Sequence, residues 1–474
     1  MLAFPAFSDP GCSGELSLAD DGAISDWTIC SRGVPLQIVD SNEGQFKINF
    51  FAQGLPQSVD QHWRRSRSSE NAVEVFQSTD TDRSLEIRRT FRSSADDAML
   101  QAISVTNMTA ETVVNFKLGL ELSDSAMEQK SGLRSLADYV YGYHRIDVAL
   151  DRGNWLHPTP GSQVHLLAIT SRHASLILRS DDLMEIDSTQ EFTEESPSPF
   201  KPDEWQVVLD EGALGPGEVR TYRFEITASP TNTKTMAQAG FRNLIYADLW
   251  VPLGVLCRWV EAFLGWLSSL VGNLGLAMLL FAVATRFVTL PASIWASRRQ
   301  QEYKMRFERA KPQMDKARRD YKGAERSERI LAIYKDNRIT PFSGLKGSVG
   351  LLVQIPFLLA IFNVTTRSSI FAHEKFLWIS DLALPDAAMA LPFVIPILGG
   401  HVNVLPLVLG VFNILSSLSD KDTSHSSKVI PIIISLLIVT VFYSFSAALV
   451  LYWLTVNLLQ AGERITLKRS KTST

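Results

Sequence analysis

The sequence predicts a multi-domain protein in which an all-β sandwich is followed by an α-helical membrane bundle. The charge is divided unevenly: residues 1–230 hold 19 Lys and Arg against 35 Asp and Glu, whereas residues 231–474 hold 27 against 15. The net charges of −16 and +12 sum to the −4 of the whole chain. The second part also carries long uncharged apolar stretches, and 474 residues by themselves favour at least two domains. We therefore expect a soluble domain over 1–230 and a membrane part after it.

Residues 1–230 have the alternating and β-branched pattern of strands, with polar or Gly/Pro turns such as Gly215-Pro216-Gly217 between them. Their number predicts a large antiparallel two-sheet sandwich of the supersandwich kind rather than one of immunoglobulin size. The basic run His62–Arg67 is expected to be a solvated loop. The predicted strands are Phe46–Phe51, Ala72–Phe76, Leu85–Phe91, Leu100–Val105, Val113–Leu122, Val164–Ile169, Ala174–Leu178, Trp205–Leu209 and Val219–Ile226.

Residues 231–270 are expected to connect the two parts through a linker and an amphipathic helix. The polar segment 228–240 predicts the linker, and Phe241–Leu270 has apolar residues at helical spacing. Arg258 and Glu261 lie between those apolar residues, which favours a helix in the headgroup layer over a second buried span. Aromatic residues typical of that layer are Trp250, Trp259 and Trp266.

The first core transmembrane helix is predicted over residues 271–297. Its apolar run Leu274–Ser297 has 24 residues, enough to cross a bilayer, and a single charge, Arg286. A guanidinium at that depth costs about 2.5–3.5 kcal/mol on insertion scales. None of the other predicted spans contains Asp or Glu, and snorkelling to either interface would be difficult. We therefore expect Arg286 to be hydrated in a polar cavity within the membrane.

A basic helical hairpin is predicted over residues 298–345. The stretch Arg298–Arg338 carries 14 Lys and Arg against 7 Asp and Glu, and its helix-forming sequence is broken at Gly323. A net charge of +7 in a short loop indicates the cytoplasmic side of the membrane.

Residues 346–464 are expected to supply four further transmembrane helices, which makes five crossings. The apolar stretches are Gly347–Thr366, Val402–Ser419 and Val429–Gly462. The last has 34 residues, too long for one crossing, so we expect two helices meeting near residues 444–448. Residues 387–400 are expected to form a broken apolar piece on the outer face, and residues 465–474 a basic cytoplasmic tail.

Several of these segments resemble the YidC/Oxa-type membrane protein insertases, in particular the Gram-negative form with a large periplasmic domain. The β region resembles the family more loosely, best in ISVTNMTAETVVNFKLGLELS (103–123). The segments that carry the resemblance are VGNLGLAMLLFAVATRFVTLP (271–291), AIYKDNRITPFSG (332–344), LLVQIPFLLAIFNV (351–364), FLWISDL (376–382) and ALVLYWLTVNLLQ (448–460).

The resemblance implies a protein that guides nascent membrane proteins from a hydrophilic groove sideways into the lipid bilayer, alone or with a Sec-type translocon. It further implies the inner membrane of a Gram-negative bacterium, with the β domain in the periplasm and the C-terminus in the cytoplasm. Ribosomes and Sec components are the expected partners, with no specific recognition of nucleic acid. We expect no catalysis, cofactor or metal, since the chain lacks GxxxxGK[ST], HExxH and GxSxG sequences.

On this resemblance Arg286 and Gln354 occupy groove positions, and Tyr452 and Trp453 match an aromatic pair in the last span. The groove residues that we predict are Arg286, Gln354, Asn363, Asn413, Ser416, Ser417, Thr440, Tyr452, Trp453 and Asn457. Three alternatives remain: a structural Arg286 that caps helix carbonyls, a small-anion transporter or channel that uses this arginine, and a sensor whose helices only anchor the β domain.

Overall fold

A computed structural model gives the fold. It describes residues 2–4, 14–19, 23–31, 34–45, 47–51, 62–68, 73–79, 85–93, 98–122, 144–149, 161–171, 174–188, 205–337, 339, 349–395, 399–418 and 429–472. The chain forms two compact units. The β unit comprises Met1–Gly254 with Thr365–Ala372, and the helical unit comprises Val255–Val364 with His373–Thr474.

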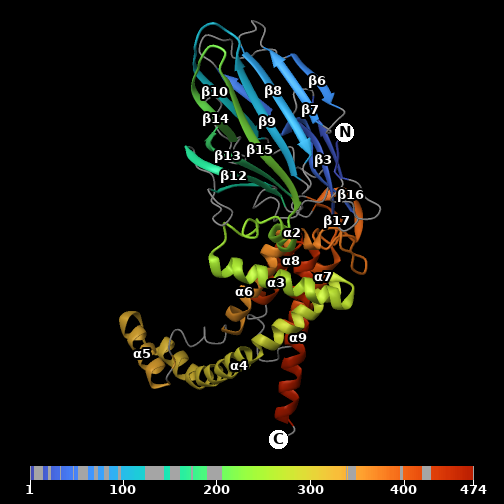
Figure 1. The fold of residues 1–474 in the computed structure, drawn as a ribbon. Coiled ribbons are helices and arrows are strands. Elements are labelled where there is room, and N and C mark those ends of the chain that lie inside the picture. The colour runs from blue at the N-terminus through green and yellow to red at the C-terminus, as the bar shows by residue number, and fades with distance from the viewer. Residues whose placement is uncertain are drawn as a thin grey trace. The chain divides into compact units, whose positions relative to one another are not determined.

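The β unit contains two antiparallel sheets (Figure 1). The smaller has the order β1-β2-β3-β4, and the larger, of 11 strands, runs β5-β10-β14-β13-β15-β9-β8-β7-β6 with β12 beside β13 and β11 beside β12. The strands are β1 Leu2–Phe4, β2 Gly14–Leu18, β3 Ile24–Ser31, β4 Val34–Gln45, β5 Lys47–Phe51, β6 His62–Ser68, β7 Val73–Thr79, β8 Leu85–Ser93, β9 Ala98–Asn107, β10 Val113–Leu122, β11 His144–Ala149, β12 Ser162–Ser171, β13 Ala174–Ser188, β14 Trp205–Leu214 and β15 Val219–Pro230.

All nine predicted strands are confirmed, most of them longer than predicted, and β15 ends at the predicted domain boundary, Pro230. Six strands were not predicted: β1 to β4, β6 and β11. The run His62–Arg67, predicted as a loop, pairs with β7 along its whole length as strand β6. Strand β6 lies at the edge of the sheet, where the side chains of Arg64 and Arg65 are exposed. A basic run can therefore form this strand without burying its charges.

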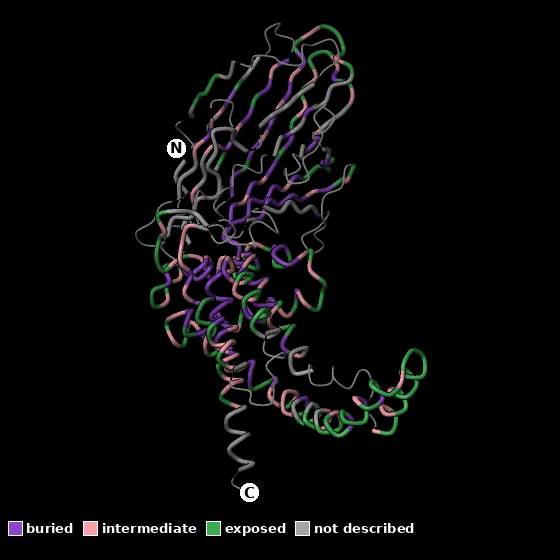
Figure 2. The backbone as a smooth tube through the Cα atoms, turned by 180° about the vertical axis from the view of Figure 1, so that it is seen from behind, coloured by how far each residue is buried: buried purple, intermediate pink, exposed green. Residues whose placement is uncertain are grey.

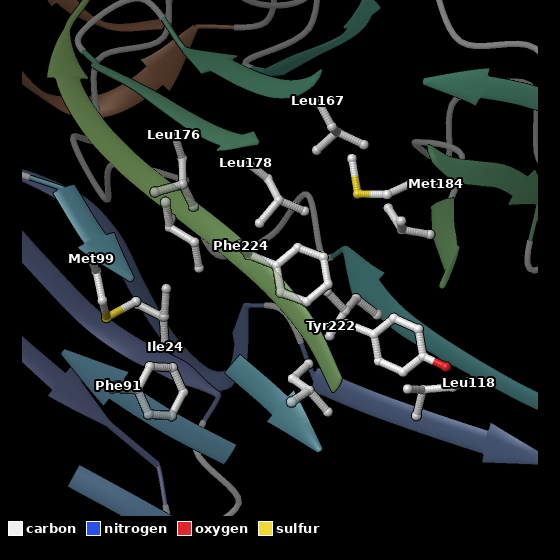
Figure 3. Packing of buried hydrophobic residues seen from close by; sticks show 14 of the residues in the cluster. Ile24, Phe91, Met99, Leu118, Leu167, Leu176, Leu178, Met184, Tyr222 and Phe224 are labelled. Carbon is white, nitrogen blue, oxygen red and sulfur yellow. The ribbon is translucent and has the colours of Figure 1, made fainter. Parts of the chain in front are cut away.

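One hydrophobic core joins the two sheets. Ile24 of the small sheet lies beside Phe91 and Met99 of the large sheet, and all three are fully buried (Figure 3). Along β9 the burial alternates residue by residue, as expected for a strand with one face on the core. The β unit is therefore a sandwich, as the sequence predicts.

The helical unit contains most of the helices. They are α3 Val251–Val271, which starts at the end of the β unit, α4 Leu274–Asp320, α5 Gly323–Asp336, α6 Val349–Arg367, which ends in the β unit, α7 Val404–Leu418, α8 Val429–Phe442 and α9 Ala447–Thr472. A short helix, α2 Thr233–Gln238, belongs to the β unit, the one-turn 3₁₀ helix η5 is Ser369–Phe371, and strands β16 Met389–Ile395 and β17 Gly399–Val402 form a separate hairpin.

Helix α4 contains both the first predicted span and the first arm of the basic hairpin. Asn273 caps its start by accepting a hydrogen bond from the backbone NH of Leu276. It continues for 47 residues without interruption, although Pro291 and Pro312 lie inside it. Each proline removes a backbone hydrogen bond, and the ribbon of α4 curves along its length (Figure 1). The boundary that the sequence places at residue 297 is therefore not a break in the helix.

The break predicted at Gly323 is confirmed, because α4 ends at Asp320 and α5 begins at Gly323. A small cluster of Ala310, Met314 and Ile339 holds this hairpin together. Nearly all of α5 is exposed (Figure 2). Among the described residues, Ile333 and Tyr334 of α5 pack against this cluster, and no residue of α5 is itself buried.

Three predicted boundaries need correction. The segment 228–240, predicted as a linker, contains the end of β15 and helix α2. The amphipathic helix begins at Val251 and not at Phe241, with Pro252 in its first turn, where proline is tolerated. The apolar segment 387–400 is largely the β16–β17 hairpin.

Two helices of the described residues are long and apolar enough to cross a membrane, α3 and α4. Helices α7 and α8 are apolar, and 15 and 14 of their residues are described. The helices that we predicted as spans exist, including the break between α8 and α9 at residues 443–446. Their membrane crossings remain predictions.

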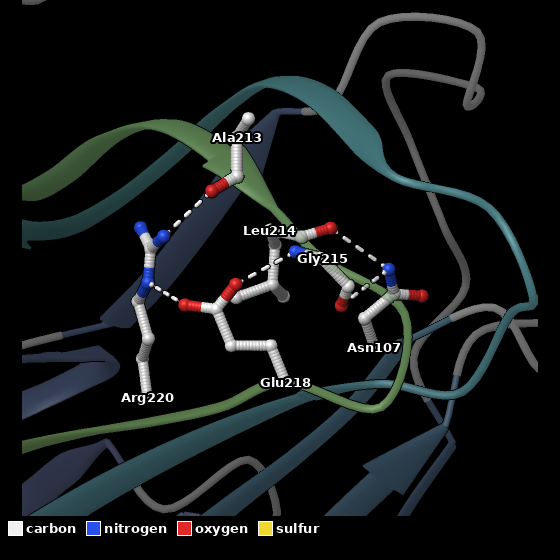
Figure 4. Close-up of polar contacts among 6 residues, drawn as sticks. All are labelled: Asn107, Ala213, Leu214, Gly215, Glu218 and Arg220. Atoms are coloured by element: carbon white, nitrogen blue, oxygen red, sulfur yellow. Dashed lines mark hydrogen bonds and ion pairs between the residues drawn. The ribbon is translucent and has the colours of Figure 1, made fainter.

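A buried asparagine fixes the turn between β14 and β15 (Figure 4). The side-chain amide of Asn107 donates hydrogen bonds to the carbonyls of Glu111, Leu214 and Gly215 at 2.8 to 3.0 Å. Nearby, Glu218 accepts hydrogen bonds from the backbone NH of Gly215 and from Arg220.

We expect Asn107→Ala to lower the free energy of unfolding by about 2–3 kcal/mol, because it removes three hydrogen bonds to carbonyls, one of them buried. Arg220→Ala is the control, since the partly exposed ion pair of Arg220 with Glu218 is worth at most about 1 kcal/mol. Chemical unfolding of the full chain, followed by circular dichroism, measures both. Equal losses would contradict the role of Asn107.

Candidate functional site

Arg286 lies in α4 and is buried, with 7% of its surface exposed. Its Nε donates a hydrogen bond to Oε1 of Glu463 in α9 at 2.7 Å, and its second terminal nitrogen contacts Oε2 of the same carboxylate. The pair is bidentate, the geometry in which guanidinium and carboxylate interact most strongly. Our prediction that Arg286 has no carboxylate partner is therefore wrong, and the hydrated cavity that we inferred from that missing partner stays a prediction.

Glu463 was not predicted as the partner of Arg286 because it lies one residue beyond the predicted end of the last span, Gly462. Helix α9 continues to Thr472 without interruption. Helices α4 and α9 run side by side in the same direction, because Phe281 contacts Tyr452, with ring centroids 5.9 Å apart, before Arg286 meets Glu463. The carboxylate that follows the apolar run of α9 thus pairs with the charged side chain inside the apolar run of α4.

The guanidinium of Arg286 is displaced towards the C-terminal end of α4. Its NH1 donates a hydrogen bond to Oγ of Ser293 at 3.1 Å, and seven residues of helix correspond to about 10 Å. Helical side chains usually lean the other way, towards the N-terminus. The side chain therefore reaches towards the basic end of α4, which we had expected to be difficult.

A second polar contact continues the same face of α9. Gln460 lies three residues before Glu463 and donates from Nε2 to Oε1 of Gln354 in α6 at 2.9 Å. Gln354 is buried, with 5% exposed. Residues Arg286, Ser293, Gln354, Gln460 and Glu463 are called the polar cluster below. It joins α4 and α6 to α9 and contains two of the predicted groove residues, Arg286 and Gln354, each bonded to α9.

Five of the other predicted groove residues make contacts outside the polar cluster. Tyr452 is fully buried against Phe281, and Trp453 stacks on Phe442 with centroids 5.7 Å apart. These aromatic rings pack between helices. Three polar side chains, those of Asn363, Thr440 and Asn457, donate to the carbonyl four residues earlier in their own helix.

Asn413 and Ser416 of α7 are half-buried, and the side chain of Ser417 lies outside the described residues. A polar side chain that donates a hydrogen bond to a carbonyl of its own helix needs neither water nor a ligand as acceptor for that donor. For Asn363, Thr440 and Asn457, a structural role is therefore sufficient to explain the geometry.

Ser293, Gln460 and Glu463 were missed as site residues. The last predicted span could have been continued as a helix for one turn beyond Gly462. Gln460 and Glu463, three residues apart, would then have lain on one face of that helix. No group of three His, Cys, Asp or Glu side chains is placed to hold a metal ion within the described part of the chain.

Residues 266–474 match a family whose description is 60Kd inner membrane protein. The membrane protein insertase YidC of Chlorobium limicola is 27% identical over 213 residues, which are 44% of this chain and 35% of that protein. The same protein of Amoebophilus asiaticus is 26% identical over 275 residues, 56% of this chain and 44% of that protein. The matched segments thus span less than half the length of these relatives.

A crystal structure of an active YidC insertase with its first transmembrane domain resolved is similar over 95% of this chain and 90% of that chain. The sequence identity is 17% and the TM-score is 0.38.

The Arg286–Glu463 pair should stabilise the packing of α4 on α9. We expect a double-mutant cycle with Arg286→Ala and Glu463→Ala to give a coupling energy of about 1–3 kcal/mol, because removal of either partner leaves the other charge poorly solvated. The matched control is the Arg299–Glu302 pair of α4, which is about half exposed and should give about 0.2–0.5 kcal/mol. Unfolding in detergent measures both cycles. A coupling at Arg286 no larger than the control would contradict a stabilising pair.

Proposed function

We propose that the chain is a membrane insertase of the YidC/Oxa type, to which residues 266–474 are similar, and that it receives nascent membrane proteins and releases them into the lipid bilayer. The observation that carries the proposal is the polar cluster. It provides a buried cation, a carboxylate and two amides on three helices, at least one of which is apolar and long enough to cross a membrane. Polar groups at membrane depth are expensive and are typical of a functional path.

The proposed mechanism is an exchange of partners at the polar cluster. An incoming acidic or polar segment competes with Glu463 for the guanidinium of Arg286. Glu463 can give way because its side chain is 26% exposed, whereas that of Arg286 is 8% exposed. The segment enters without the full desolvation penalty, since each hydrogen bond that it breaks with water is replaced. Gln354 and Gln460 offer further donors and acceptors.

Release is proposed to be driven by lipid. An apolar stretch of the substrate leaves the polar cluster when its side chains partition into the bilayer, which supplies about 25 cal/mol per Å² of apolar surface. The step needs no nucleotide and no covalent chemistry. Ribosomes and Sec components are proposed partners, because a nascent chain must be delivered before its apolar segments aggregate.

The proposed topology has the β unit in the periplasm and crossings by α4, α6, α7, α8 and α9, in the inner membrane of a Gram-negative bacterium. The α4–α5 hairpin and the C-terminal tail are then cytoplasmic, in keeping with the net charge of +7 over residues 298–338. Helix α3 is proposed to lie in the headgroup layer. Its exposed Trp259 and Trp266 are seven residues apart on one face, while Glu261 is buried on another.

The small-anion transporter is the weaker alternative. An anion would have to displace a bidentate carboxylate from Arg286, and the double-mutant cycle above measures how strongly that carboxylate is held. An insertase substrate faces the same competition, but it brings an apolar segment whose transfer to lipid offsets the cost.

A photo-crosslinker at Gln354 should capture a ribosome-bound nascent membrane protein several-fold more often than one at Phe287. Both positions lie at membrane depth in the proposed topology, but Gln354 belongs to the polar cluster whereas Phe287 is 70% exposed and lipid-facing. Crosslinking in inverted membrane vesicles measures the yields, with a soluble nascent chain as a further control. Equal yields at the two positions would contradict a polar path.

Labelling of single cysteines tests the topology. We expect Met108→Cys in the β unit to react with an impermeant maleimide on spheroplasts, and Glu328→Cys in α5 to react only after permeabilisation. Both side chains are exposed, so access depends on the side of the membrane and not on burial. If α3 crossed the membrane as well, both cysteines would react from the same side.

A further inference from the structure

Residues Phe376–Ile379 form a tight hairpin that presents two apolar side chains to its surroundings. The backbone NH and carbonyl of Phe376 both pair with Ile379, at 3.0 and 2.9 Å. At the tip, Leu377 is 75% exposed and Trp378 is 49% exposed. In a soluble protein, water would face both side chains.

The backbone of Leu377 is in the left-handed region, with φ of 53°. In a two-residue hairpin a positive φ at the first tip position is normally supplied by glycine, because a side chain there is strained. Packing within the chain does not offset this backbone strain at Leu377, because most of its side chain is exposed. Its side chain is therefore suited to a contact outside the chain.

The hairpin is fixed to the first turn of α4. Asn273, which caps α4, donates from Nδ2 to the carbonyl of Lys375 at 3.0 Å. Gly275 lies so close to the ring of Phe376 that a Cβ at this position would stand 2.2 Å from the ring. The N-terminal part of α4 is apolar and long enough to cross a membrane. In the proposed topology its first turn, and the hairpin fixed to it, lie at one boundary of the membrane.

The hairpin is also fixed to the first turn of α7. The indole Nε1 of Trp378 donates to Oδ2 of Asp386 at 3.3 Å. Asp386 is buried, and the same oxygen accepts hydrogen bonds from the backbone NH groups of Val404 and Leu405. The indole is thus oriented by its NH while nearly half of its surface stays exposed, the arrangement typical of tryptophan at a lipid–water interface.

We propose that the Phe376–Ile379 hairpin is a depth stop that inserts Leu377 and Trp378 into the interfacial layer of the outer leaflet. Its contacts with Asn273 and Asp386 transmit that depth to the starts of α4 and α7. The flanking Lys375 and Ser380 are exposed and polar, which suits the headgroup region. The proposal rests on the proposed crossing of α4, but not on the polar cluster or on insertase activity.

Nitroxide labels on single cysteines test the proposal in the full chain, with Cys12, Cys30 and Cys257 replaced by alanine. The label positions are Leu377→Cys, its polar neighbour Ser380→Cys, and Phe287→Cys as the deep reference. The protein is reconstituted in vesicles of phosphatidylcholine and phosphatidylglycerol. Power saturation then compares the collision rates of each label with oxygen, which enriches in lipid, and with a water-soluble nickel chelate.

We expect the ratio of oxygen to nickel collisions to be several-fold higher at Leu377 than at Ser380, and highest at Phe287. Equal ratios at Leu377 and Ser380, with a high ratio at Phe287, would overturn the depth stop while leaving the crossing of α4 intact. A water-like ratio at Phe287 would overturn the crossing itself, and with it both proposals.

Discussion

The helical unit depends on the ion pair of Arg286 with Glu463. A guanidinium inside an apolar helix is tolerated only if an opposite charge pairs with it. The free-energy cost of removing an unpaired charge from water exceeds the free energy gained from packing. The pair matches that charge and at the same time fixes how far α9 is shifted along α4. Gln460 extends the constraint to Gln354, so a single face of α9 determines the positions of three helices.

Near the start of α4, a second set of polar contacts fixes where helices begin. Asp386 accepts the first backbone NH groups of α7, and the amide of Asn403 donates to the carbonyl of Tyr443. The phenol of Tyr443 donates in turn to the carbonyl of His401. Helix starts leave unpaired NH groups that must find partners where water is scarce. Polar contacts thus lie on both sides of the apolar middle of the helical unit. The proposed insertase function uses the contacts around Arg286, and the proposed depth stop uses those at the starts of α4 and α7.

Much of the fold was predictable because strands and helices leave periodic patterns. Period-two alternation identified nine strands, and apolar stretches identified helices α4, α6, α7, α8 and α9, including the break between α8 and α9. Predictions failed where a pattern was weak or ambiguous. Strand β6 is rich in arginine and is a strand because β7 pairs with it. The segment 387–400, predicted only as a broken apolar piece, contains strand β16 and the start of β17.

The sequence by itself determined the division into an acidic β part and a basic helical part, and it singled out Arg286 and Gln354, since composition, charge and periodicity are local properties. Only the tertiary structure decided what those side chains contact. Glu463 is 177 residues from Arg286, and no local pattern states which helix faces which. Two residues far apart in a chain become partners when helix packing brings their faces together, and that packing depends on every side chain in between. For this reason the charge inside the apolar part of α4 was visible in the sequence, whereas its partner was not.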